Sequence, residues 1–150
     1  MEKALDNIPI DNIQSQKGHS IWQKSNQAGQ HFWGVDHFCG LAKTTPKRDC
    51  DLTALEWDGN EVRIGIASSI SDMIIHALGI ILAWKEQMES DYADVPFDVL
   101  LSIDYGEEDV APSATLRFWA VRNQKHYVIP SAAVLEEFSQ PVLMEQVNLK

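Results

Sequence analysis

A long apolar segment near the middle of the chain limits the folds that are open to it. Between residues 69 and 89, apolar side chains cover most of the circumference of a helix and leave only a narrow stripe of small or polar residues. Ser69 and Asp72, a hydroxyl followed three residues later by an acid, form a capping-box pattern that predicts where this helix starts. A helix that is apolar on most sides is a buried one, so other parts of the chain must cover it.

Alternating apolar and polar residues predict strands on both sides of this helix. Before it, we expect a strand within residues 31–40 and a β-hairpin over residues 52–66, whose Asp58-Gly59-Asn60 turn tolerates positive φ. After it, we expect a strand over 97–105, a hairpin over 115–129, a short helix over 132–138 and a last strand from 141 to 147. The predicted fold is α+β: a mainly antiparallel sheet with one long buried helix and a short second helix.

The chain has 150 residues, which favours a single domain. Residues 1–30 are rich in Gln, Asn, Ser and Lys and are predicted to form a polar N-terminal arm, with residues 31–150 as the α+β domain. The first residues lack the apolar core of a secretory signal, and the most apolar run is too short to cross a bilayer. Two cysteines do not make a disulfide framework, so we expect a cytoplasmic protein.

The negative charge of the chain is concentrated in one stretch. The formal net charge is −10, a field that repels nucleic acid and anionic membranes and attracts basic partners. Residues 86–109 hold nine acids and no base, whereas the rest of the chain is close to neutral. Charge runs usually form only a solvated surface. The alternative is an acidic patch that docks a basic protein, and a calcium loop is disfavoured because its fixed Asp/Asn/Gly spacing is absent.

Histidine and cysteine residues form the second candidate site. His31, His37, Cys39 and Cys50 are residue types that bind zinc, and residues 31, 37 and 39 share one face if they lie on a strand. Their spacing matches no zinc-finger pattern, and Cys39 beside a histidine is the weaker alternative of a thiol nucleophile. No phosphate-binding glycine loop, G-x-S-x-G or H-E-x-x-H motif is present, so we expect a protein that is not an enzyme and has no cofactor.

Tryptophans provide candidate anchors for a protein partner. Trp57, Trp84 and Trp119 fall in predicted strands or the helix and are expected in the core. Trp22 and Trp33, near the polar arm, are candidates for an exposed anchor, since aromatic residues beside acids are typical of binding hot spots.

The segment TLRFWAVRNQKHYVIP at residues 115–130, which follows a buried strand and an acidic loop, gives the chain a resemblance to a known class. Over residues 53–147, the chain resembles bacterial immunity proteins paired with contact-dependent growth inhibition toxins and related polymorphic toxins. The resemblance implies a small acidic α+β protein that binds its cognate toxin domain, often a basic nuclease, and blocks the active site. It assigns no individual residues.

These observations favour a toxin-neutralising protein with a basic partner and leave its oligomeric state open. We expect the partner to contact acids of the 86–109 stretch, namely Glu107, Glu108, Asp109, Asp91, Asp94 and Glu89. If the helix packs across the sheet, the end of the helix and the acidic loop are expected to meet at one edge. The alternatives are a small acidic secretion chaperone, an inhibitor that mimics nucleic-acid charge, and a metal or thiol enzyme that uses His31, His37 and Cys39.

Overall fold

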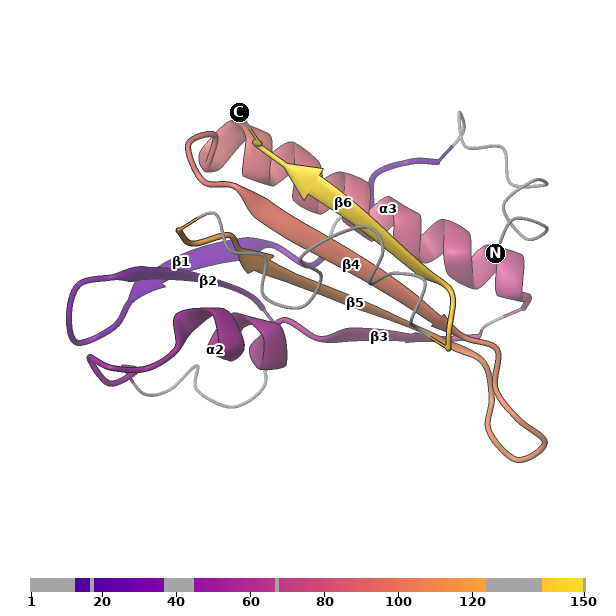
Figure 1. The fold of residues 1–150 in the computed structure, drawn as a ribbon. Helices are drawn as coiled ribbons and strands as arrows, with labels where there is room; N and C mark the ends of the chain where they lie inside the picture. The colour runs from indigo at the N-terminus through magenta and orange to yellow at the C-terminus, as the bar shows by residue number, and fades with distance from the viewer. Residues whose placement is uncertain (1–12, 17, 37–44, 67, 124–138, 150) are drawn as a thin grey trace.

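The computed structural model describes residues 13–16, 18–36, 45–66, 68–123 and 139–149. The elements follow in this order: β1 (Ile21–Ser25), β2 (His31–Val35), α2 (Leu52–Gly59), β3 (Val62–Gly65), α3 (Ile70–Asp91), β4 (Phe97–Asp104), β5 (Ser113–Ala120) and β6 (Val142–Val147). β3, β5, β4 and β6 form a four-stranded antiparallel sheet in that order, and β1 and β2 form a separate hairpin (Figure 1). The predicted α+β class is confirmed.

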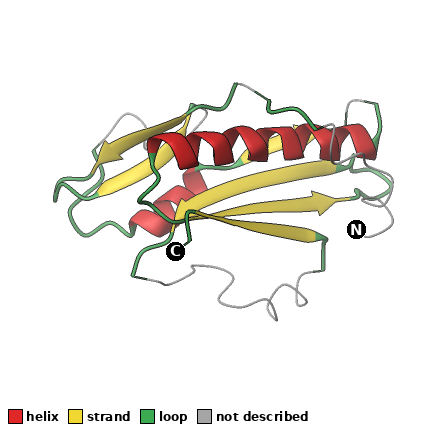
Figure 2. Ribbon diagram, turned by 90° about the horizontal axis from the view of Figure 1, so that it is seen from above, coloured by secondary structure: helices red, strands yellow, loops and turns green. Residues whose placement is uncertain are grey.

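The predicted long helix is α3, and it lies along one face of the sheet (Figure 2). The Ser69 hydroxyl accepts a hydrogen bond from the Asp72 backbone N–H at 3.0 Å, as the capping box predicts. The hydroxyls of Ser68 and Ser69 donate to the Asp72 carboxylate and lower its pKa. Further along, Trp84 packs edge-on against Phe118 of β5, with ring centroids 5.1 Å apart. Burial of this face against the sheet is what holds the helix in place.

The predicted strands after α3 are confirmed where the structure describes them. β4 and β6 fall within the predicted ranges, and β5 is the first strand of the predicted 115–129 hairpin. β5 pairs with β4 on one side and with β3 on the other, which makes it a central strand. The predicted return strand of this hairpin and the predicted short helix over 132–138 lie outside the described residues.

The hairpin predicted over residues 52–66 is wrong in its first half. Residues 52–59 form α2, because the Asp51 carboxylate accepts hydrogen bonds from the backbone N–H groups of Thr53 and Ala54, both at 3.0 Å, and so caps a helix. The Asp58-Gly59 pair ends this helix instead of turning a hairpin. The second half is a strand as predicted, and α2 is the short helix of the described fold.

The β1–β2 hairpin includes residues that we placed in the polar arm. β1 pairs with β2 in antiparallel register, and Ile21 is buried against the core. Trp33 contacts Phe97 edge-on at a centroid distance of 5.5 Å. The prediction that Trp33 is an exposed anchor is wrong, since only 6% of the residue is exposed. Trp22 is half-buried: its indole N–H donates to the Val35 carbonyl at 2.9 Å.

Two side chains, one on α2 and one at its C-cap, join this hairpin to the four-stranded sheet. Glu56 and Asn60, four residues apart, both have no exposed surface, and we call them the α2 seam. The Glu56 carboxylate accepts the backbone N–H of Trp33 at 3.0 Å through Oε1 and that of Ala120 at 2.8 Å through Oε2. β3 pairs with β5 only at residues 113–116. Beyond that point the seam bonds to backbone groups of both β2 and β5, as a strand lying between them would.

Every polar side-chain atom of the seam has a hydrogen-bond partner. Asn60 accepts the Val35 N–H at 3.2 Å and donates to the carbonyls of Trp33 and Phe118 at 3.0 and 3.1 Å. Arg122 binds both Glu56 oxygens, at 2.6 and 2.8 Å. Burial raises the pKa of Glu56, whereas the Arg122 guanidinium and the two backbone N–H groups oppose that rise. Its contacts are those of a structural group, with all its acceptor capacity used inside the protein.

Candidate partner-binding surface

The loop between β4 and β5 holds three of the predicted partner-binding acids in a fixed conformation. Glu107 and Val110 exchange two backbone hydrogen bonds, each at 3.0 Å, so Glu108 and Asp109 form a two-residue turn at the tip. At the base, the Asp104 carboxylate accepts the Gly106 N–H at 2.9 Å. Figure 1 shows the loop, in orange, projecting beyond the end of the sheet. Its acids are therefore presented on a preorganised tip.

Apolar side chains are exposed beside these acids. Tyr105 is 42% exposed and Val110 is 55% exposed, and Glu107, Glu108 and Asp109 are exposed as well. Ile66, 38% exposed, follows the end of β3 that pairs with Ser113, so it lies at the same end of the sheet. This projecting surface combines a tyrosine, a residue type enriched in binding hot spots, with exposed aliphatic side chains and a block of negative charge.

The loop conformation depends on Gly106, and replacing this glycine tests the described conformation. Gly106 has φ +75°, and an added Cβ would lie 2.1 Å from the Val110 carbonyl oxygen. We expect Gly106→Ala to lower the free energy of unfolding by about 1–2 kcal/mol or more and to displace the tip. Chemical denaturation measures the stability, and amide chemical shifts of residues 107–110 report the displacement. A variant with unchanged stability and shifts would contradict the loop conformation described above.

The other three predicted acids lie at the opposite end of the sheet. Glu89 and Asp91 are on the last turn of α3 and Asp94 follows it, all exposed, and with Glu86 we call them the helix-end acids. β4 runs its full eight residues between this end and the acidic loop, which separates the two groups by about 25 Å (Figure 1). The expectation that both groups meet at one edge is wrong, because the strand that joins them keeps them apart.

The helix-end acids oppose the helix that carries them. The last turn of α3 holds no basic residue, and acids there face the negative end of the helix dipole. Lys85, one turn earlier, pairs with Glu145 of β6 at 2.6 Å, and this contact raises the pKa of Lys85. The helix-end acids therefore lower the stability of α3.

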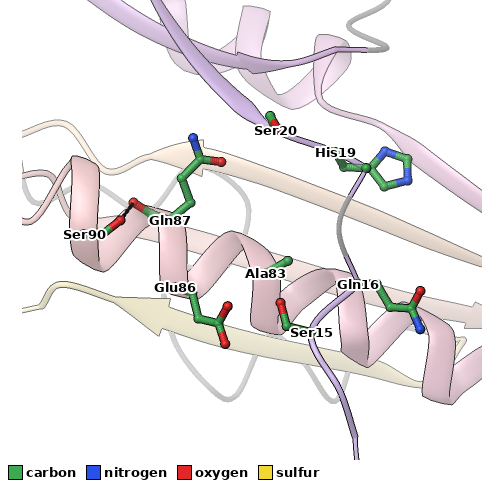
Figure 3. A pocket seen from close by; sticks show the side chains of 9 residues that line it. Ser15, Gln16, His19, Ser20, Ala83, Glu86, Gln87 and Ser90 are labelled. Atoms are coloured by element: carbon green, nitrogen blue, oxygen red, sulfur yellow. Dashed lines mark hydrogen bonds between the residues drawn. The ribbon is translucent and has the colours of Figure 1, made fainter.

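A groove runs beside the helix-end acids. It has a volume of about 430 Å³ and lies between α3 and residues 15–16 and 18–20 (Figure 3). Figure 3 shows Glu86, Gln87 and Ser90 along the helix, with Ser15 and Ser20 on the neighbouring segment. Gln87 is already used: its amide donates to the Ile21 carbonyl and accepts the Ile21 N–H, both at 2.8 Å. Among the residues that line the groove, the only carboxylate is that of Glu86.

The histidine and cysteine cluster is only partly within the described structure. His31 is exposed on β2, and its Nδ1 lies 2.9 Å from the Ser25 hydroxyl across the hairpin. His37 and Cys39 lie outside the described residues, and Cys50 is half-buried. Within the described ranges, no carboxylate bonds to the His31 ring and no three metal-ligating side chains come together. The zinc and thiol hypotheses therefore stay predictions from the sequence.

The chain matches no protein-family model, no curated protein and no solved structure. None of the helices in the described part of the chain has both the length and the hydrophobicity that crossing a membrane requires.

Proposed function

We propose that this chain is an inhibitory binding protein of the immunity class, which binds a basic toxin domain in the cytoplasm and blocks its active site. The observation that carries the proposal is the β4–β5 loop, a projecting tip that holds Glu107, Glu108 and Asp109 between the exposed side chains of Tyr105 and Val110. The acidic loop inserts into a basic cleft of the partner and blocks it.

Electrostatics support this function. A chain with a net charge of −10 is drawn to a basic surface over long range, which raises the rate of association. Close to the partner, carboxylates on the tip pair with Lys and Arg side chains that would otherwise bind the phosphates of nucleic acid. The resemblance to immunity proteins favours a nuclease domain as the partner.

The rigidity of the loop supports the same function. The paired hydrogen bonds between Glu107 and Val110 fix the tip before binding, so little conformational entropy is lost when the complex forms. Tyr105 and Val110 supply apolar area that gains free energy when the partner covers it. Charge then gives the speed of association, and the apolar anchors give affinity and specificity.

Co-expression tests the function. The C-terminal domain of a secreted protein encoded immediately upstream of this chain is expressed from an inducible promoter, with and without the chain. We expect the domain to stop growth when expressed alone and the chain to restore it. An unrelated acidic protein of similar size and charge serves as the control and should not protect. Growth arrest that persists when the chain is present in excess would contradict the proposal.

A further inference from the structure

The outer face of the four-stranded sheet, turned away from α3, carries a row of polar side chains. In the register of the sheet, Arg63 of β3 lies opposite Thr115 of β5, and Thr115 lies opposite Ser102 of β4. Neighbouring strands are about 4.8 Å apart, so a guanidinium and two hydroxyls follow one another across three strands. These three side chains and Gln140, just before β6, line one open groove of about 390 Å³.

A second arginine is fixed in the next row of the same groove. Arg117 donates to the Trp57 carbonyl at 2.8 Å, pairs with Glu61, and stacks on the Trp57 ring with its guanidinium carbon 4.7 Å from the centroid. Three contacts hold this side chain in one orientation, and the Glu61 carboxylate balances its charge. Leu100, which lies opposite Arg117 on β4, gives the groove an apolar floor.

The side chains of Arg63, Thr115 and Ser102 have hydrogen-bonding groups that no other described side chain uses. Arg63 is exposed, and neither its guanidinium nor the hydroxyls of Ser102 and Thr115 bond to another described side chain. Ser102 and Thr115 are half-buried, where a hydroxyl needs a partner more than it does at an open surface. Among the described residues, the groove therefore holds several donors without a partner and one positive charge without a paired acid, in a chain whose net charge is −10.

We propose that this groove binds a carboxylate. The carboxylate oxygens accept from the Arg63 guanidinium and from the hydroxyls of Thr115 and Ser102, and the carbon part of the ligand rests on Leu100 and Trp57. One unbalanced charge matches a monoanion, whereas a phosphate dianion brings more charge than Arg63 neutralises and meets the repulsion of the whole chain. The carboxylate comes from a free small acid or from an acidic side chain of a protein. This site does not depend on the proposed function.

Nuclear magnetic resonance titration of the full chain tests the site. The probes are acetate, N-acetyl-aspartate N-methylamide and inorganic phosphate, followed through the Trp57 indole and the amides of residues 102 and 115. We expect both carboxylates to bind saturably with a dissociation constant on the order of millimolar, and phosphate to bind more weakly. Arg63→Gln should weaken carboxylate binding about tenfold or more. Arg48→Gln removes an exposed arginine outside the groove and should leave binding unchanged.

The two carboxylate probes separate the sources. Equal affinity for both supports a site for a free small acid, and tighter binding of the aspartate diamide supports a site for an acidic side chain of a protein. The proposal is overturned if no saturable shift occurs, if phosphate binds as tightly as acetate, or if Arg63→Gln and Arg48→Gln have the same effect. Since Arg63 and Arg48 are exposed and neither side chain has a hydrogen bond or ion pair with another described residue, both variants should fold as the natural chain does.

Discussion

Glu56→Ala is expected to lower the free energy of unfolding by about 3–5 kcal/mol. The substitution leaves the Arg122 guanidinium without its bidentate partner, and it removes the acceptor for the backbone N–H groups of Trp33 and Ala120. These donors lie in or beside the core, so water cannot fully replace the carboxylate. Urea denaturation followed by tryptophan fluorescence measures the loss, which should move the midpoint by about 2 M.

A matched glutamate gives the control. Glu61 also pairs with an arginine, Arg117, but its side chain is 31% exposed, and Glu61→Gln should cost less than about 1 kcal/mol. Hydrogen exchange adds a local readout, because in Glu56→Ala the amides of β2 should exchange faster than those of β4. If the two variants lost the same stability, or if β2 kept its protection, the α2 seam would not be what joins the hairpin to the sheet.

Charge reversal of the loop is expected to weaken binding of the toxin domain by about a thousandfold or more. In the triple variant Glu107→Lys, Glu108→Lys and Asp109→Lys, attraction to the partner's basic residues becomes repulsion at three positions. Close charge pairs at protein interfaces contribute at least about 1.5 kcal/mol each, so the dissociation constant should rise by about a thousandfold or more. The reversed acids are exposed at the tip of a turn, so the fold should keep its stability. Surface plasmon resonance gives both rate constants.

The helix-end acids give a control of equal charge. Glu86→Lys, Glu89→Lys and Asp91→Lys change the net charge by the same amount at the other end of the sheet. This variant should slow association, because long-range attraction falls with net charge, but it should leave dissociation nearly unchanged. It should also stabilise α3, since bases at the helix end favour its dipole. If the helix-end variant raised the dissociation rate and the loop variant did not, the binding site would lie at the helix end.

The core elements of the fold were predictable because their signals are local. α3 carries both its cap and its apolar pattern within 20 or so residues, and β4 and β6 are apolar runs of strand length. β1 was missed because its exposed residues, Gln23, Lys24 and Ser25, make it as polar as the arm before it, and only Ile21 is buried. α2 was missed because the Asp58-Gly59 pair is a strong hairpin signal and the Asp51 cap was not recognised.

The α2 seam could not be found from sequence patterns. Glu56 and Asn60 are buried polar residues, so they interrupt the apolar pattern by which a packed helix is usually recognised. Their partners lie 23 to 66 residues away in the chain, and only the tertiary structure brings them together. A buried acid of this kind looks in a sequence like an ordinary surface residue.

The charge count shows where the acids lie in the sequence, but it does not show how they are arranged in space. The loop acids were identified from the charge count, and the structure adds the turn that fixes them and the exposure of Tyr105 and Val110. The separation from the helix-end acids follows from the length of β4, since a strand of eight residues holds its two ends about 25 Å apart. The length of the predicted strand over 97–105 is therefore enough to show that the two groups of acids lie far apart.

Titration of the purified chain into the purified toxin domain, with the toxin's activity as the readout, tests the proposed function most directly. We expect the activity to fall linearly to zero at one chain per toxin domain, and the triple loop variant to leave the activity intact at the same ratio. Full toxin activity in the presence of excess chain would contradict the function, and full inhibition by the triple loop variant would contradict the role of the β4–β5 loop.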